Sequence, residues 1–239
     1  MRWDRGRVFW LVVVGLLVAY AIFQLGLRRL VTISLSLLLA ITVHEFAHAW
    51  VADRLGDPTA RYLGRVSLNP IVHLDPLGTM MMVMTAATGM GIGWGKPVPV
   101  SPHRLRFGRR LGNGIVALAG PTANLLLATV VGLVWRFVRP LPLWPTEIFT
   151  GVTMTNIVIA MFNLLPLPPL DGHSVLLALL SLSQARWAWY ASQFMMRLAQ
   201  QGPLILILVI LVAPFLGINL IGSLIGPPTR FFYRAIVGL

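Results

Sequence analysis

Five residues carry the clearest chemical signal in the sequence, the run His-Glu-Phe-Ala-His from His44 to His48. They lie inside a stretch that is apolar enough to form a membrane-spanning helix. In an α-helix, residues four apart point the same way and lie about 6 Å apart along the axis, so His44 and His48 can hold one ion between them. Two imidazoles and a carboxylate are costly to place in lipid, and a bound metal would compensate for that cost.

Zinc is the metal that this pattern predicts, as one ion per chain. It binds neutral imidazole nitrogens, and a catalytic zinc site keeps a position open for water, whose pKa falls to about 7. Glu45 projects beside the ion, where it can take the proton of that water and pass it to the leaving amine of a peptide. The alternatives are histidines that act as interhelical hydrogen-bond partners, or a motif that lines a metal-ion transport path.

A third ligand has to come from another segment, and without cysteines it has to be His, Asp or Glu. Asp171 follows three prolines and precedes a glycine in the apolar segment Asn163 to His173. Prolines prevent a continuous helix there, and irregular backbone at membrane depth is tolerated only where it is buried in protein or lines a wet cavity. We therefore expect Asp171 to be the third ligand. Capping a short helix is its alternative role, and the two roles are compatible.

His73 is the other candidate near the site. It lies between two prolines in the segment Ser67 to Thr79, which follows the motif helix closely and could fold back toward it. We expect His73 to position a ligand or the substrate and not to bind the metal itself.

The composition indicates an all-α polytopic membrane protein. Hydrophobic residues make up 57% of the 239 residues, charged residues only 11%, and the mean hydropathy is +0.80. Two short apolar stretches, Leu77 to Ile92 and Ser174 to Leu182, suggest broken or re-entrant helices, and we expect about six transmembrane helices in a single integral-membrane domain over residues 1–239. The longer candidate spans are Val8 to Leu27, Leu30 to Ala52, Ile115 to Val138, Val152 to Leu165 and Leu204 to Ile225.

The distribution of basic residues indicates how the chain is anchored and oriented in a membrane. The first apolar segment follows three arginines, as in a signal peptide, but it is too long and lacks a small-residue cleavage site, so we expect it to stay as an anchor. The net charge of +12 is spread over short loops, which is typical of positive-inside topology and of contact with anionic headgroups and does not indicate nucleic-acid binding. The densest basic loop, Lys96 to Arg110, is predicted to be cytoplasmic. A bacterial inner membrane is the expected location.

Taken together, these segments resemble the site-2 proteases, peptidase family M50, which are intramembrane zinc metalloproteases that cut the transmembrane segments of membrane-anchored proteins. The resemblance runs from HEFAH through SLNPIVHLDPLGT and GWGKPVPV to AGPTANLLLA and NLLPLPPLDGH. The two metal-binding motifs follow in the family's order and in a membrane context. The chain is similar to the compact branch of the family, which lacks PDZ and CBS domains.

The resemblance implies a role for each matching residue. It makes His44, His48 and Asp171 the zinc ligands and Glu45 the catalytic base. Asn163 resembles a family asparagine that holds the substrate or the oxyanion, and an interhelical hydrogen bond is its alternative role; Asn124 is a weaker match to such a residue. Gly120 and Pro121 are expected to shape close helix packing.

The segment Gly91 to Val100 resembles a stretch that forms a short re-entrant β-hairpin near the site in relatives. Such an edge could accept an extended substrate as an added strand. The expected partners are therefore a transmembrane protein substrate and the lipid bilayer, and the oligomeric state stays open. A membrane metal-ion transporter and a non-catalytic zinc-binding membrane protein are the alternative functions.

Overall fold

The computed structural model describes residues 26–88 and 94–238, together with residues 13, 15, 16, 19, 20, 22 and 23. The expected first span, Val8 to Leu27, therefore lies largely outside the described residues. The described part consists of helices and contains no strand, which confirms the all-α expectation for that part. Its one isolated β-bridge pairs Leu74 with Gly95 in antiparallel fashion.

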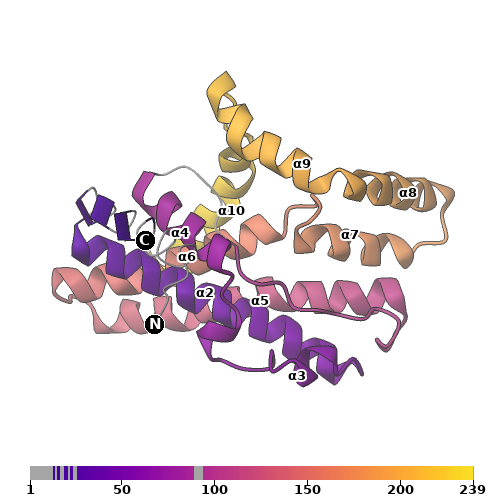
Figure 1. The fold of residues 1–239 in the computed structure, drawn as a ribbon, viewed down its shortest axis with the longest axis horizontal. Coiled ribbons are helices and arrows are strands. Elements are labelled where there is room, and N and C mark those ends of the chain that lie inside the picture. The colour runs from indigo at the N-terminus through magenta and orange to yellow at the C-terminus, as the bar shows by residue number, and fades with distance from the viewer. Residues whose placement is uncertain are drawn as a thin grey trace, which may run out of the picture.

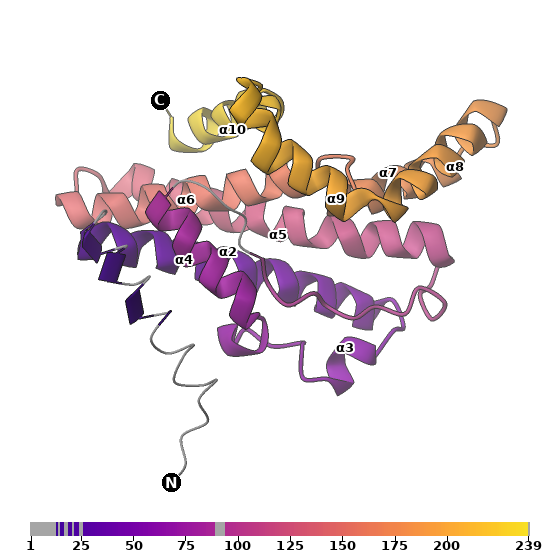
Figure 2. The ribbon, with the colours of Figure 1, turned by 45° about the horizontal axis from the view of Figure 1, so that its top comes forward.

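Three long helices, α2 (Leu27–Arg54), α5 (Arg109–Val138) and α6 (Leu143–Asn163), run side by side along the molecule (Figures 1 and 2). Helix α5 packs against both α2 and α6 and also against the short helix α7 (Asp171–Ser181). The main apolar core lies between α5, α6 and the C-terminal helix α10 (Leu220–Val237). Its buried members are Ala128, Trp135, Ile157, Ala160, Met161, Ile236 and Val237.

Small residues allow these helices to approach closely. A Cβ added at Gly114 of α5 would lie 2.2 Å from the Cβ of Ala178 in α7, and one at Gly151 of α6 would lie 3.1 Å from the Oγ of Ser36 in α2. Helix contacts of this kind are common in membranes, where packing and not water exclusion drives association. As a result, the backbones of α2, α5, α6 and α7 come near enough for their side chains to share one site.

Two of the expected spans are confirmed as helices long and apolar enough to cross a membrane, namely α2 and α5. Helix α8 (Arg186–Gln200) and the segment Gly202–Ile210 count as a third span only if the pair, bent by 75°, is one broken span. The described residues therefore contain two candidate spans, or three with the bent pair, and the expected number of about six is not confirmed. The short stretch Ser174 to Leu182 corresponds to α7, and the start of Leu77 to Ile92 corresponds to α4 (Pro76–Thr88).

The expected span Leu204 to Ile225 is not one helix. It is divided among α9 (Gly202–Ile207), a π-helical turn at Leu208–Val212, a 3₁₀ turn at Ala213–Leu216 and the start of α10. Pro214 cannot donate a helical hydrogen bond, and Gly217 has a left-handed φ of 74°, which ends the turn. The Asn219 side chain then accepts a hydrogen bond from the Gly222 amide and begins a new helix.

The re-entrant hairpin expected over Gly91 to Val100 is not confirmed. Residues 91–93 lie outside the described residues, and the remainder, 94–100, has no regular secondary structure apart from a bridge at Gly95. Gly95 in this remainder pairs with Leu74, which precedes α4, so the antiparallel contact joins two loops. The Lys96 amide adds a hydrogen bond of 2.7 Å to the His73 carbonyl.

A buried carboxylate ties the basic loop to the end of α2. Asp57 is fully buried and accepts hydrogen bonds from the amide and hydroxyl of Thr59 and from the amide of Ser101. Burial acts to raise the pKa of the Asp57 carboxyl, but these hydrogen bonds and the charge of Arg104 outweigh it, so the pKa lies below its usual value. Deprotonated Asp57 therefore stabilises this loop.

We expect Asp57→Ala to lower the melting temperature of the purified protein in detergent, because each buried donor left without an acceptor costs about 1–3 kcal/mol. Since folding lowers the pKa of Asp57, its stabilisation is complete above about pH 4, the unfolded value, and is lost as the pH falls through the lower folded value. The difference in melting temperature between wild type and variant should shrink in that acidic range.

Glu147→Gln, which removes a half-exposed ion pair with Arg28, is the control. A difference that stays constant with pH would contradict the assignment.

Candidate metal centre

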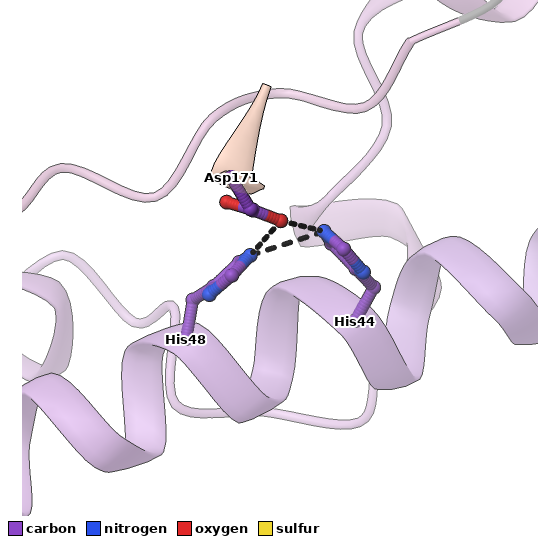
Figure 3. A group of neighbouring side chains, drawn as sticks. All are labelled: His44, His48 and Asp171. Atoms are coloured by element: carbon purple, nitrogen blue, oxygen red, sulfur yellow. Dashed lines mark hydrogen bonds and ion pairs between the residues drawn. The ribbon is translucent and has the colours of Figure 1, made fainter. Parts of the chain in front are cut away.

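Helix α2 and the start of α7 bring three side chains together (Figure 3). The Nε2 atoms of His44 and His48 are 3.0 Å apart, and the Oδ2 of Asp171 lies 3.1 Å from the first and 3.3 Å from the second. Both histidines are buried and Asp171 is mostly buried. The two motifs that the sequence analysis singled out therefore meet at one point, although they are far apart in the chain.

The other ring nitrogen of each histidine contacts a carbonyl oxygen. His44 Nδ1 lies 2.6 Å from the side-chain oxygen of Asn124, and His48 Nδ1 lies 2.7 Å from the backbone oxygen of Val116. Because a carbonyl oxygen only accepts, each Nδ1 has to carry the hydrogen. A neutral imidazole with its hydrogen on Nδ1 has a lone pair on Nε2, which is the form that binds a metal ion.

The donor set fits a cation. Asp171 Oδ2 is buried and receives no hydrogen bond from any described residue, so three electron-pair donors face one another with no hydrogen between them. A proton on one imidazole would satisfy one or two of these contacts, whereas a cation satisfies all three. Tetrahedral zinc with ligands at about 2.0–2.1 Å places those ligands about 3.3 Å apart, close to the observed separations.

The backbone around Asp171 explains why its carboxylate is available. Helix α7 begins at Asp171, and Leu170 occupies the N-cap position, so Asp171 lies in the first turn and is not the capping residue. At the next residue, a Cβ on Gly172 would lie 2.2 Å from the Leu164 carbonyl oxygen, and only glycine allows α7 to start against the end of α6. Asn113 of α5 donates to the Ser174 hydroxyl at 3.2 Å and holds α7 in place.

Glu45 is half-buried and, among the residues that the structure describes, its carboxylate has no hydrogen-bond or ion-pair partner. The segment 94–100 passes beside it, because a Cβ added at Gly95 would lie 3.5 Å from Glu45 Oε1 and 2.8 Å from a methyl group of Ile41. A Cβ at position 95 would thus be in ordinary contact with the carboxylate but would overlap Ile41. Glu45 directly follows His44, one of the three candidate metal ligands, in the sequence.

Gly120 of α5 lies against the two histidines of the site. A Cβ added there would lie 2.5 Å from His48 Nε2 and 2.6 Å from His44 Cε1, so the backbone of α5 lies directly against both imidazoles. The sequence indicated Gly120 as a helix-packing residue, and the packing proves to be against the metal-binding side chains.

The three further residues that the sequence suggested for substrate or oxyanion contact have different surroundings. Asn124 uses its oxygen for His44 and its amide hydrogens for Ala40 and Asn156, so it positions a histidine. His73 is fully buried, and its Nε2 contacts the Ser67 carbonyl oxygen at 2.7 Å. Asn163 donates to the Ile159 carbonyl within α6 and makes no interhelical hydrogen bond through that group. For His73 and Asn163, a substrate role stays a prediction.

Sequence analysis missed Asn156. It is fully buried in α6, and its only signal in the sequence is an amide residue within an apolar helix.

Sequence comparison with curated relatives identifies the family of the chain. The chain is 39% identical over 150 residues to the "Putative zinc metalloprotease YwhC" of Bacillus subtilis, covering 59% of this chain and 66% of the relative. It is 32% identical over 184 residues to the "Putative zinc metalloprotease Rip2" of Mycobacterium tuberculosis strain H37Rv, covering 75% of this chain and 66% of the relative. The chain belongs to the site-2 protease family.

A second Rip2, from Mycolicibacterium smegmatis, is 35% identical over 144 residues, which is 58% of this chain and 53% of the relative. The site-2 protease chain thus spans about half to two thirds of the length of the curated relatives it matches. No protein-family model and no solved structure matches it.

For this site-2 protease homologue, we expect Gly120→Ala to abolish or strongly weaken zinc binding, because the added methyl group would overlap both imidazoles. Gly132→Ala is the matched control. Its Cβ meets Ile236 at a comparable 2.5 Å in the same helix, about 18 Å along the axis from the site. Both variants should melt at lower temperature, but only Gly120→Ala should lose zinc in a chelator competition assay. Equal zinc retention by the two variants would refute the contact.

Proposed function

We propose that this chain is an intramembrane zinc metalloendopeptidase that cleaves transmembrane segments of membrane-anchored proteins. The observation that carries the proposal is the convergence of His44, His48 and Asp171 from two helices. Glu45 follows the first of them, and its carboxylate has no hydrogen-bond or ion-pair partner among the described residues. The family of the chain and the names of its relatives support a zinc metalloprotease.

His44, His48 and Asp171 would hold the zinc ion. When bound there, zinc would lower the pKa of water and polarise the scissile carbonyl group. Glu45 accepts the proton of the attacking water as a general base and then donates it to the leaving amine as a general acid. Asn124 and Val116 keep the ring hydrogens on the Nδ1 atoms, so both Nε2 lone pairs remain directed at the ion.

The depth of the site supports cleavage within the membrane. Helix α2 is long and apolar enough to span a bilayer, and its two histidines lie about 9 to 15 Å from its end at Arg54. Helix α5, the second such span, covers the site through Gly120. A peptide bond that reaches these residues would belong to a membrane-embedded segment, and a bacterial inner membrane is the proposed location.

The segment 94–100 is the proposed place for the substrate backbone. A transmembrane helix hides its peptide bonds in internal hydrogen bonds, so it has to unwind before cleavage. Gly95 lies beside Glu45, so a substrate strand that pairs with this segment would have its backbone near the base. We keep Asn163 and the His73 loop as proposed substrate contacts.

Metal-ion transport is less well supported. A transport path requires further ligands along its length. Among the described residues, His44, His48 and Asp171 form the single group of three or more histidine or acidic residues that could hold a metal ion. Mere zinc binding would not require a carboxylate in the position of Glu45.

We expect Glu45→Gln to reduce cleavage by about 10²- to 10⁴-fold, because the amide cannot accept the proton of the attacking water. The variant should fold and retain zinc as wild type does. Cleavage of single-span reporter proteins in proteoliposomes and zinc content by elemental analysis are the measurements.

Glu147→Gln, which replaces a carboxylate paired with Arg28, is the control and should cleave as wild type does. Full activity in Glu45→Gln would exclude this mechanism. Zinc flux across the proteoliposome membrane without reporter cleavage would support the transporter instead.

A further inference from the structure

A hydrogen-bonded relay joins the candidate metal centre to α6. Asn124 of α5 accepts from His44 Nδ1 through its side-chain oxygen at 2.6 Å. Its Nδ2 group donates to the Ala40 carbonyl at 2.9 Å and to the Asn156 side-chain oxygen at 2.8 Å. Asn156 in turn donates to the Val152 carbonyl at 2.8 Å. Asn124 and Asn156 are both fully buried, so water does not compete for these bonds.

The acceptors in this chain of hydrogen bonds determine how the two amide groups are oriented. The Val152 carbonyl only accepts, so the Nδ2 group of Asn156 has to face it and the Asn156 oxygen has to face Asn124. That oxygen also only accepts, so it selects the Nδ2 group of Asn124. The Asn124 oxygen is thereby left to face His44. The Val152 carbonyl thus fixes the orientation of the Asn156 amide, and the Asn156 oxygen fixes the orientation of the Asn124 amide.

The orientation of Asn124 matters for the metal. If its amide turned over, an N–H group would face His44 Nδ1, and the imidazole would move its hydrogen to Nε2 to avoid two opposed hydrogens. That hydrogen would then point toward His48 Nε2 and Asp171 Oδ2, where the ion is expected. One wrong amide orientation therefore removes one of the three electron-pair donors.

The Ala40 carbonyl and the Asn156 oxygen each receive a hydrogen of the Asn124 amide, and both favour this orientation. The Ala40 carbonyl lies four residues before His44 in α2 and also receives the helical hydrogen bond of the His44 amide. The Asn156 oxygen is the second acceptor and comes from a different helix. In a buried network, a group that loses one of its partners is costly, because no water replaces it.

We propose that Asn156 is a positioning residue for the metal: through Asn124 it keeps the hydrogen of His44 on Nδ1 and the Nε2 lone pair directed at the ion. The inference rests on the proposed zinc site. It predicts that a residue without contact to the metal ligands controls zinc affinity. Outer hydrogen-bond partners of metal-binding histidines typically change metal affinity by about 10- to 100-fold when they are replaced.

The test compares four purified proteins in detergent. Asn156→Leu removes both hydrogen bonds at similar volume. Asn156→Ser is too short to reach Asn124 but can bond to the Val152 carbonyl, as Ser36 and Ser192 do to carbonyls four residues before them. Thr153→Val is the matched control, because Thr153 is a fully buried α6 residue whose hydroxyl has no hydrogen-bond partner.

Two readouts are measured. Zinc affinity is obtained by competition between the protein and a chelator, with Zn²⁺ alone as the probe. The position of the His44 ring hydrogen in zinc-free protein is read from ¹⁵N NMR of labelled imidazole, with a His44→Gln sample for assignment. We expect Asn156→Leu and Asn156→Ser to weaken zinc binding about 10- to 100-fold and to place part of the His44 hydrogen on Nε2. Thr153→Val should match wild type in both.

Wild-type zinc affinity and an unchanged His44 tautomer in Asn156→Ser would overturn the inference and leave Asn156 as an interhelical contact. The serine variant decides the matter even if Asn156→Leu fails to fold. Wild-type protein that binds no zinc would instead overturn the proposed function. The two failures are therefore distinguishable.

Discussion

The structure depends on holding three electron-pair donors within about 3 Å of one another in the interior of a helical protein. Such an arrangement repels itself unless a cation is present, so the protein has to restrain each donor separately. His44 is restrained by Asn124, His48 by the backbone of Val116, and Asp171 by its place at the first turn of α7. The restraints on the two histidines come from α5 and not from their own helix, so this part of the site is a product of tertiary packing.

Helix α5 supplies most of that packing. It contacts α2, α6 and α7, and glycines mark the places where it approaches closest. Gly114 brings it against α7, and Gly120 brings it against the two imidazoles. Gly172, outside α5, does the same for the junction of α6 and α7. Close backbone approach thus sets the distance between the histidine helix and the aspartate helix, and side chains of ordinary size at these positions would hold the ligands apart.

The part of the site that follows from local pattern could be predicted from the sequence. The four-residue spacing of His44 and His48 and the prolines before Asp171 are short-range signals, and the structure brings all three side chains together. Asn124 was indicated by a motif but its partner was not, because hydrogen bonds between residues such as Asn124 and Asn156 depend on how separate helices are placed.

The span Leu204 to Ile225 was mistaken for one helix because hydropathy does not register the combined effect of Pro214 and Gly217. The hairpin prediction rested on resemblance, and the described residues offer one bridge instead.

The glycines that lie against α2 have a consequence for how this site can vary. An added Cβ at Gly120 would overlap both imidazoles, and one at Gly95 would lie 2.8 Å from a methyl group of Ile41, so neither position has room for a methyl group. A larger residue at either position would therefore require the histidine helix to shift. The spacing of the two histidines from their neighbours is set by the absence of side chains as much as by their presence.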